Sequence, residues 1–182
     1  YTGIKVGAAT TNNYTVWNTT TGNFNGSVLN ATAYTSAAQT LQINYYDVKT
    51  FKNSGSDVTG GTYNWTVYET GSRPGSPTFS SINLVWLADL GGGDQKWGFT
   101  GNTTSILGAP AVSFTSGLKN YTFEFYVQVN GLAPDGAVYD NNGGAASNYT
   151  ATFSTIPEPS TYALLALSAM GLGGYVMRRR RR

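Results

Sequence analysis

The stretch Tyr121-Thr122-Phe123-Glu124-Phe125-Tyr126-Val127-Gln128-Val129 decides the fold class of this chain. Aromatic and aliphatic residues occupy its odd positions and mostly polar residues occupy its even positions, so the two kinds point to opposite sides of a strand. The pattern predicts a half-buried β-strand. On this strand we expect Phe125 in the core and Glu124 on the polar side, where a solvated charge is the usual outcome.

Similar but shorter alternation recurs along the chain, at residues 41–45, 63–67, 82–86 and 149–153. Further strands are expected at residues 4–8, 28–34, 96–99 and 112–114. Turn-rich segments separate these runs, at residues 53–56, 60–61, 71–75, 91–94 and 141–144. Short strands punctuated in this way predict an all-β fold, an antiparallel β-sandwich of about 8–10 strands.

Composition excludes several classes of protein. Cysteine and histidine are both absent, which removes disulfides, thiolate zinc sites, cysteine nucleophiles and imidazole bases. The net charge of +2 comes from the C-terminal end, because residues 1–155 hold six Lys and Arg against eight Asp and Glu. Nucleic acid is therefore not an expected partner. Because the sequence begins with Tyr1 and not Met, we expect a signal peptide to have been removed.

The stretch from residue 156 to 182 has three successive parts. Pro157-Glu158-Pro159 cannot extend a strand, since proline has no backbone N–H and a fixed φ. Residues 162–177 are apolar and uncharged and predict one C-terminal hydrophobic helix of about 24 Å, against about 30 Å for a bilayer core. The third part is a run of five arginines that would stop transfer across the membrane: Arg178, Arg179, Arg180, Arg181 and Arg182. The chain thus divides into a domain at 1–155 and a tail at 156–182.

This order of parts resembles the PEP-CTERM sorting tail, the exosortase signal of Gram-negative bacteria that make extracellular polysaccharide. The resemblance implies export, recognition of Pro157, Glu158 and Pro159 by a transpeptidase-like membrane enzyme, and removal or transfer of the tail. An ordinary stop-transfer anchor is the alternative. Both interpretations place residues 1–155 outside the cytoplasm, at the cell surface or in the extracellular space, with the helix anchoring the protein in the membrane before processing.

Residues 44–153 are also similar to small β-sandwich modules of secreted, surface-sorted bacterial proteins. The landmarks are Tyr63-Asn64-Trp65-Thr66-Val67-Tyr68, Gly92-Gly93-Asp94-Gln95-Lys96-Trp97 and Asp140-Asn141-Asn142-Gly143-Gly144. The last of them, with Tyr149 after it, resembles a segment of starch-binding modules as well. Tyr139 stands where those modules have tryptophan.

A sugar site needs a flat aromatic ring with amide or carboxylate groups at its edge. The candidate rings are Trp86, Trp97, Tyr139 and Tyr149, and the candidate edge groups are Asp94, Gln95, Asn141 and Asn142. Trp65, Trp86 and Tyr149 lie in strand patterns, where a core position is the usual outcome. Trp97, beside a glycine-rich turn, fits either role. We therefore assign possible glycan binding to Trp97, Tyr139, Asn141, Asn142, Asp94 and Gln95.

Two further chemistries are weaker alternatives. Asp140 and Asn142 offer oxygen ligands for calcium, but an Asn-Gly turn explains the same residues, so no cofactor is expected. A glycosidase needs two facing carboxyl groups, and the glutamates available before the tail are Glu69 and Glu124. With Glu124 expected to be solvated, we predict no catalytic residues and no enzyme activity.

Two functions remain. The first is a non-enzymatic structural protein of the cell surface or matrix that self-assembles into a layer or filament, with residues 1–17 as a strand donated to a neighbour. The second is a glycan-binding module that retains extracellular polysaccharide at the surface. The expected partners are an exosortase-like enzyme, the membrane, other copies of the chain, and polysaccharide.

Overall fold

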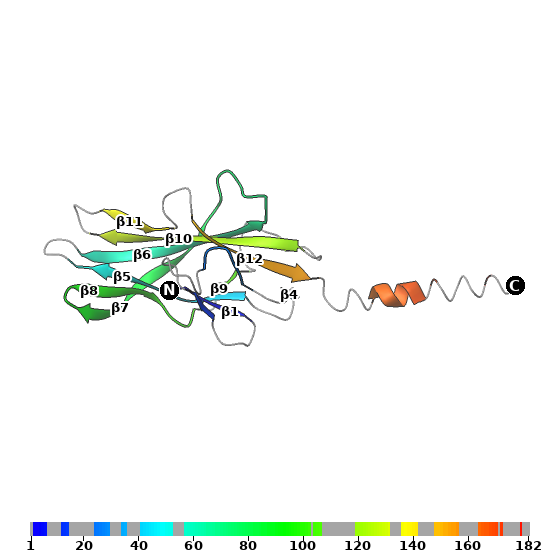
Figure 1. Ribbon diagram of the computed structural model, residues 1–182, viewed down its shortest axis with the longest axis horizontal. Coiled ribbons are helices and arrows are strands. Elements are labelled where there is room, and N and C mark those ends of the chain that lie inside the picture. Colours follow the sequence, from blue (N-terminus) through cyan, green and yellow to red (C-terminus); the bar gives the residue numbers. More distant parts are fainter. Residues whose placement is uncertain are drawn as a thin grey trace.

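The protein is described by a computed structural model (Figure 1). The described residues are 2–6, 12–14, 24–29, 34–35, 41–52, 57–102, 104–106, 119–131, 136–141, 148–156, 164–170, 172 and 179. They form twelve strands and a short helical segment at residues 164–170. The prediction of an all-β fold followed by a C-terminal helix is confirmed.

The strands are β1 (Thr2–Val6), β2 (Asn12–Tyr14), β3 (Ser27–Val28), β4 (Tyr34–Thr35), β5 (Leu41–Phe51), β6 (Val58–Glu69), β7 (Ser80–Gly91), β8 (Asp94–Phe99), β9 (Thr104–Ser105), β10 (Lys119–Gly131), β11 (Ala137–Asp140) and β12 (Tyr149–Ile156). Their number exceeds the expected 8–10, because β2, β3, β4 and β9 have only two or three residues each. Strands this short show no alternating pattern in the sequence.

All of these strands belong to one curled sheet, in the order β2-β1-β5-β8-β7-β6-β10-β12-β3. The strand β11 also pairs with β10, β4 with β12, and β9 with β5. The strand β7 connects the two halves of the sheet: residues 80–84 pair with β6, and residues 85–91 pair with β8. Figure 1 shows β7 crossing from one half to the other. The sheet therefore folds over on itself and encloses the core between its halves.

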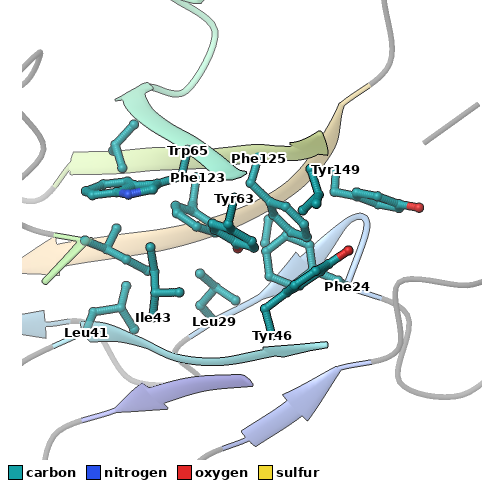
Figure 2. Packing of buried hydrophobic residues seen from close by; sticks show 14 of the residues in the cluster. Phe24, Leu29, Leu41, Ile43, Tyr46, Tyr63, Trp65, Phe123, Phe125 and Tyr149 are labelled. Carbon is teal, nitrogen blue, oxygen red and sulfur yellow. The ribbon is translucent and has the colours of Figure 1, made fainter. Parts of the chain in front are cut away.

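The core is aromatic. Leu41, Ile43 and Tyr46 point from β5 toward the side chains of β6 and β10 (Figure 2). The ring of Tyr46 contacts that of Tyr63 at 5.2 Å between centroids, although β5 and β6 are not hydrogen-bonded neighbours. Every odd position from 121 to 129 is buried, as the alternation in the sequence predicted. The contact across the two halves explains why one face of β10 is fully covered.

The prediction of antiparallel pairing is confirmed for most of the sheet. It is wrong at β12, because β3 and β4 both run parallel to that strand. Parallel neighbours require a long connection, and the chain between β4 and β12 provides one. The expected single strand at residues 28–34 is also wrong in its described part, since Leu29 lies outside both β3 and β4. The strand expected at 112–114 and the turns expected at 53–56 and 142–144 lie outside the described residues.

Glycines serve two purposes in the sheet, as turn residues and as points of close contact between strands. Gly92 and Gly93 form the turn between β7 and β8 with φ of 62° and 92°, as the two-residue hairpin of this kind requires. The turn expected at Gly60-Gly61 is wrong, because both residues lie inside β6. A Cβ at Gly61 would stand 2.6 Å from the carbonyl oxygen of Gln128 on β10, so the absent side chain permits close contact between these strands.

The N-terminal segment occupies a place in its own sheet. The strand β1 pairs with β5 of the same chain, and β2 pairs with β1. The expectation that residues 1–17 are donated to a neighbouring copy therefore fails for residues 2–6 and 12–14. Because β1 already forms backbone hydrogen bonds with β5, the same N–H and C=O groups cannot bond to the sheet of a neighbouring copy.

Candidate functional site

Three of the residues predicted to bind glycan lie on β8. Asp94 forms an ion pair with Lys49 of β5, at 2.5 Å. Gln95 is buried, and its Oε1 accepts a 3.4 Å hydrogen bond from Nε1 of Trp97. Trp97 itself is half-buried. The groups expected at the edge of a sugar are thus engaged with other side chains of the protein.

The other predicted residues lie in the opposite half of the sheet. Tyr139, on β11, is 54% exposed, and Asn141 directly follows that strand. Asn142 lies outside the described residues. Since β11 pairs with β10 while β8 lies between β5 and β7, these residues and those of β8 are on strands that are not neighbours. The six residues proposed from the sequence therefore form two separate groups.

The aromatic residues expected in the core differ in how far they are buried. Trp65 and Tyr149 are buried, as predicted. The prediction is wrong for Trp86, which is 51% exposed. Trp86 is the cross-strand partner of Trp97, in the part of β7 that has left β6. Because β7 separates from β6 after Leu84, the strand loses the neighbour that would help to cover Trp86.

Asp140 joins three strands. Its two carboxylate oxygens accept hydrogen bonds from the hydroxyl groups of Tyr46 on β5, at 2.7 Å, and Tyr149 on β12, at 2.9 Å. Burial, followed by the charge of Asp140, raises the pKa of both tyrosines, so both remain protonated donors. Within the described ranges, no group of three or more acidic side chains is arranged to hold a metal ion. The calcium alternative at Asp140 and Asn142 stays a prediction.

Glu124 departs furthest from its expected environment. It is 1% exposed on the outer side of the sheet, and the expectation of a solvated charge is wrong. Arg73, from the loop that connects β6 and β7, donates from Nε to Oε2 and from a terminal nitrogen to Oε1, both at 2.8 Å. Tyr68 donates to Oε2 at 2.8 Å and Asn148 to Oε1 at 2.7 Å. Figure 1 shows the loop between β6 and β7 rising over β10.

The carboxylate of Glu124 is held ionised. Burial raises its pKa, but the hydrogen bonds from Arg73, Tyr68 and Asn148 outweigh burial and leave the pKa below its usual range. The sequence contained one sign of this ion pair, because Arg73 is the one arginine of residues 1–155. An arginine in a segment that otherwise uses lysine suggests that its guanidinium forms two parallel hydrogen bonds with a carboxylate, a contact that lysine cannot make.

The two glutamates do not form a glycosidase pair. Glu69 is the cross-strand partner of Tyr121, and Glu124 is that of Thr66. Positions 121 and 124 are an odd number of residues apart on β10, so Glu69 and Glu124 point to opposite sides of the sheet. Glu69 is exposed and pairs with Lys119 at 2.8 Å. Two carboxyl groups on opposite sides of a sheet cannot act on one glycosidic bond.

The second half of β7 presents an unpaired edge. Within the described part of the chain, residues 85–91 pair with β8 alone, while β6 pairs only with residues 80–84. Val85, Trp86 and Leu90 along this edge are 54%, 51% and 53% exposed. We call residues 85–91 the β7 edge. Exposed apolar side chains beside free backbone N–H and C=O groups are what an added strand contacts.

The tail is described only in part. Residues 164–170 and 172 are helical and exposed, which confirms part of the helix expected at 162–177. None of the described helical residues belongs to a helix long and apolar enough to span a membrane. Pro157, Glu158 and Pro159 lie outside the described residues, as do Arg178, Arg180, Arg181 and Arg182. The strand β12 extends to Ile156, directly before this motif.

Comparison with known proteins identifies the tail. The family model of the PEP-CTERM protein-sorting motif matches residues 155–182. No curated protein and no solved structure matches the chain. The match agrees with the Pro-Glu-Pro, apolar run and arginine run found in the sequence. The chain therefore carries a PEP-CTERM sorting motif and is an exported, exosortase-sorted protein of the bacterial surface.

Proposed function

We propose that residues 1–155 form a non-enzymatic structural domain that exosortase delivers to the cell surface, where copies associate by strand addition. The single observation that carries this proposal is the β7 edge, which pairs with β8 alone among the described strands and exposes Val85, Trp86 and Leu90. Opposite placement of Glu69 and Glu124, and the absence of histidine and cysteine, support a role without catalysis.

Association through the β7 edge predicts dimers in which two copies pair β7 with β7. A two-fold contact of this kind places the same residues on both sides. Such a contact would cover the apolar side chains of the β7 edge and give its backbone N–H and C=O groups hydrogen-bond partners. The two register irregularities opposite β8, after Trp86 and after Asp89, bend the strand and limit how many residues can pair. We therefore expect a reversible association that depends on protein concentration.

Lysines on the β7 edge are expected to abolish the association. The variant Val85→Lys with Leu90→Lys introduces like charges that face each other in a paired edge, and lysine is a residue that natural edge strands use against pairing. Sedimentation velocity of the full chain over a range of concentrations measures the result. We expect dimers or larger species in the wild type and monomers in the double variant.

Val28→Lys is the matched control, because Val28 is equally apolar, 61% exposed, and lies on β3 in the other half of the sheet. It should associate like the wild type. A wild-type protein that stays monomeric at high concentration would contradict the proposal. Association that survives in the double variant would move the contact to another surface, such as the tail.

Sorting is expected to depend on Pro157, Glu158 and Pro159. Replacing all three with alanine should leave the C-terminal residues uncleaved, because the apolar run and the arginines persist while the recognition element is lost. A chain that ends at Ile156 should be released as a folded β domain, since β12 is kept complete. Cell fractionation with intact-mass analysis measures both results. If the alanine variant is processed like the wild type, these residues are not the recognition element.

Glycan binding is the second candidate function. The residues first proposed for it are split between two halves of the sheet, so the proposal in that form loses its support. Tyr139, however, lies exposed next to other uncharged polar residues. Their arrangement supports a different glycan site.

A further inference from the structure

We propose a binding site for an uncharged polysaccharide on the outer side of β11, β10, β6 and β7, which goes beyond the proposed self-association. Two rows of cross-strand partners define it. One row is Tyr139, Gln128, Thr62 and Asn83, and the other is Tyr126, Asn64 and Ser81. We call these seven residues the tyrosine-amide face. Partners in register share a side of the sheet, and the alternate positions Val127, Val129 and Tyr63 are buried on the other side.

Aromatic rings supply one requirement of a sugar site. Tyr139 is 54% exposed, and its ring contacts that of Tyr126 at 6.2 Å between centroids. Phe79, at the end of the loop before β7, packs edge-on against Tyr126 at 5.1 Å. The tyrosine rings are therefore held by neighbours and do not have to be ordered by the ligand. An exposed ring of this kind is suited to the apolar C–H side of a sugar.

Hydrogen-bonding groups supply the other requirement. Ser81 donates to Oδ1 of Asn64 at 2.6 Å, and Nδ2 of Asn64 donates to Oγ1 of Thr62 at 3.0 Å. Buried Asn64 thus fixes the two hydroxyl groups beside it. Nε2 of Gln128 donates to Oδ1 of Asn130 at 3.0 Å, which orients its Oε1 as an acceptor. Asn83 is exposed at the end of the first row.

Charge decides which class of glycan fits. All seven residues of the tyrosine-amide face are uncharged. The charged residue of β10 on this side of the sheet is Glu124, two residues from Tyr126, and it is paired with Arg73. An anionic polysaccharide would find no cation among these seven residues, whereas hydroxyl groups would find amides and hydroxyls. Three strand spacings make the longer row about 14 Å across, which favours a chain of several sugars over a single one.

The test is affinity electrophoresis of the full chain through gels containing hydroxyethyl cellulose, dextran or alginate. We expect retardation by at least one of the two neutral polymers and none by alginate. The variants Tyr139→Ala and Tyr126→Ala should each weaken binding about tenfold, as truncation of a central aromatic contact does. Near-UV circular dichroism and melting temperature check that both variants stay folded. Tyr139, being mostly exposed, can be removed without loss of core.

Trp86→Ala is the matched control, because it removes an equally exposed aromatic ring from the β7 edge. It should bind polysaccharide like the wild type. No retardation by either neutral polymer, equal retardation by alginate, or unchanged binding in a folded Tyr139→Ala variant would each overturn the proposal. Self-association is measured separately by sedimentation, so either proposal can fail while the other stands.

Discussion

Replacing Phe125 with aspartate is expected to abolish folding. The side chain is fully buried, and its ring stacks on Tyr63 at 4.6 Å and on Tyr149 at 5.1 Å, with Phe24 edge-on at 4.9 Å. Loss of the ring alone costs about 3–5 kcal/mol. A buried carboxyl group without a partner adds several kcal/mol, and the total approaches the roughly 5–15 kcal/mol that stabilise a typical domain.

Circular dichroism during heating measures the effect. Phe125→Asp should show no cooperative transition. Phe125→Leu is the control, because it keeps an apolar side chain at the same place and loses only the ring contacts, so it should fold with a lower melting temperature. A cooperative melt of Phe125→Asp within a few degrees of the wild type would show that Phe125 does not lie in the core that Figure 2 displays.

Arg73→Ala is expected to have the second-largest effect, because it leaves Glu124 buried without its cation. Breaking a buried ion pair costs about 3–5 kcal/mol. We expect the lower end, about 3 kcal/mol at pH 7, since Arg73 is 48% exposed and water can replace part of its contact. Chemical denaturation followed by tryptophan fluorescence measures the free energy of unfolding. Tyr68 and Asn148 still donate to Glu124 in the variant, which limits the loss.

The pH dependence of this loss identifies its cause. In the wild type the pKa of folded Glu124 is lowered, so its contribution to stability is present above the unfolded-state pKa of about 4.3 and is lost as the pH falls through the folded-state pKa. Without Arg73, one of the causes that lower this pKa is lost, so the pKa of folded Glu124 should rise relative to the wild type. The variant should therefore gain less stability than the wild type as the pH rises from about 4 toward neutrality.

The difference in stability between the wild type and Arg73→Ala should therefore be large at pH 7 and should shrink as the pH falls through the lowered pKa of folded Glu124. Glu124→Gln in each background is the control, because it removes the titrating group and should remove this pH dependence. A loss of stability that stays the same from neutral pH down to the acid limit of folding would mean that Arg73 acts through packing of the loop and not through Glu124.

The fold class and the tail follow from local patterns. Alternation at residues 121–129 correctly placed Phe125 in the core, because successive side chains of any strand point to opposite sides, whatever its neighbours are. The Pro-Glu-Pro, apolar and arginine segments are contiguous in the chain, so the sequence contains the whole motif that the family model matches. Neither conclusion needs knowledge of which segments come together in space.

The environments of Glu124 and Trp86 needed the tertiary structure. Glu124 is buried because Arg73, 51 residues away in the sequence, reaches it from a loop over the sheet. Trp86 is exposed because β7 exchanges its partner β6 for β8 after Leu84. The two groups of predicted glycan residues were separated in the same way, by the order of strands. Alternation determines which side of a strand a residue occupies, but only contacts between distant segments determine what covers that side.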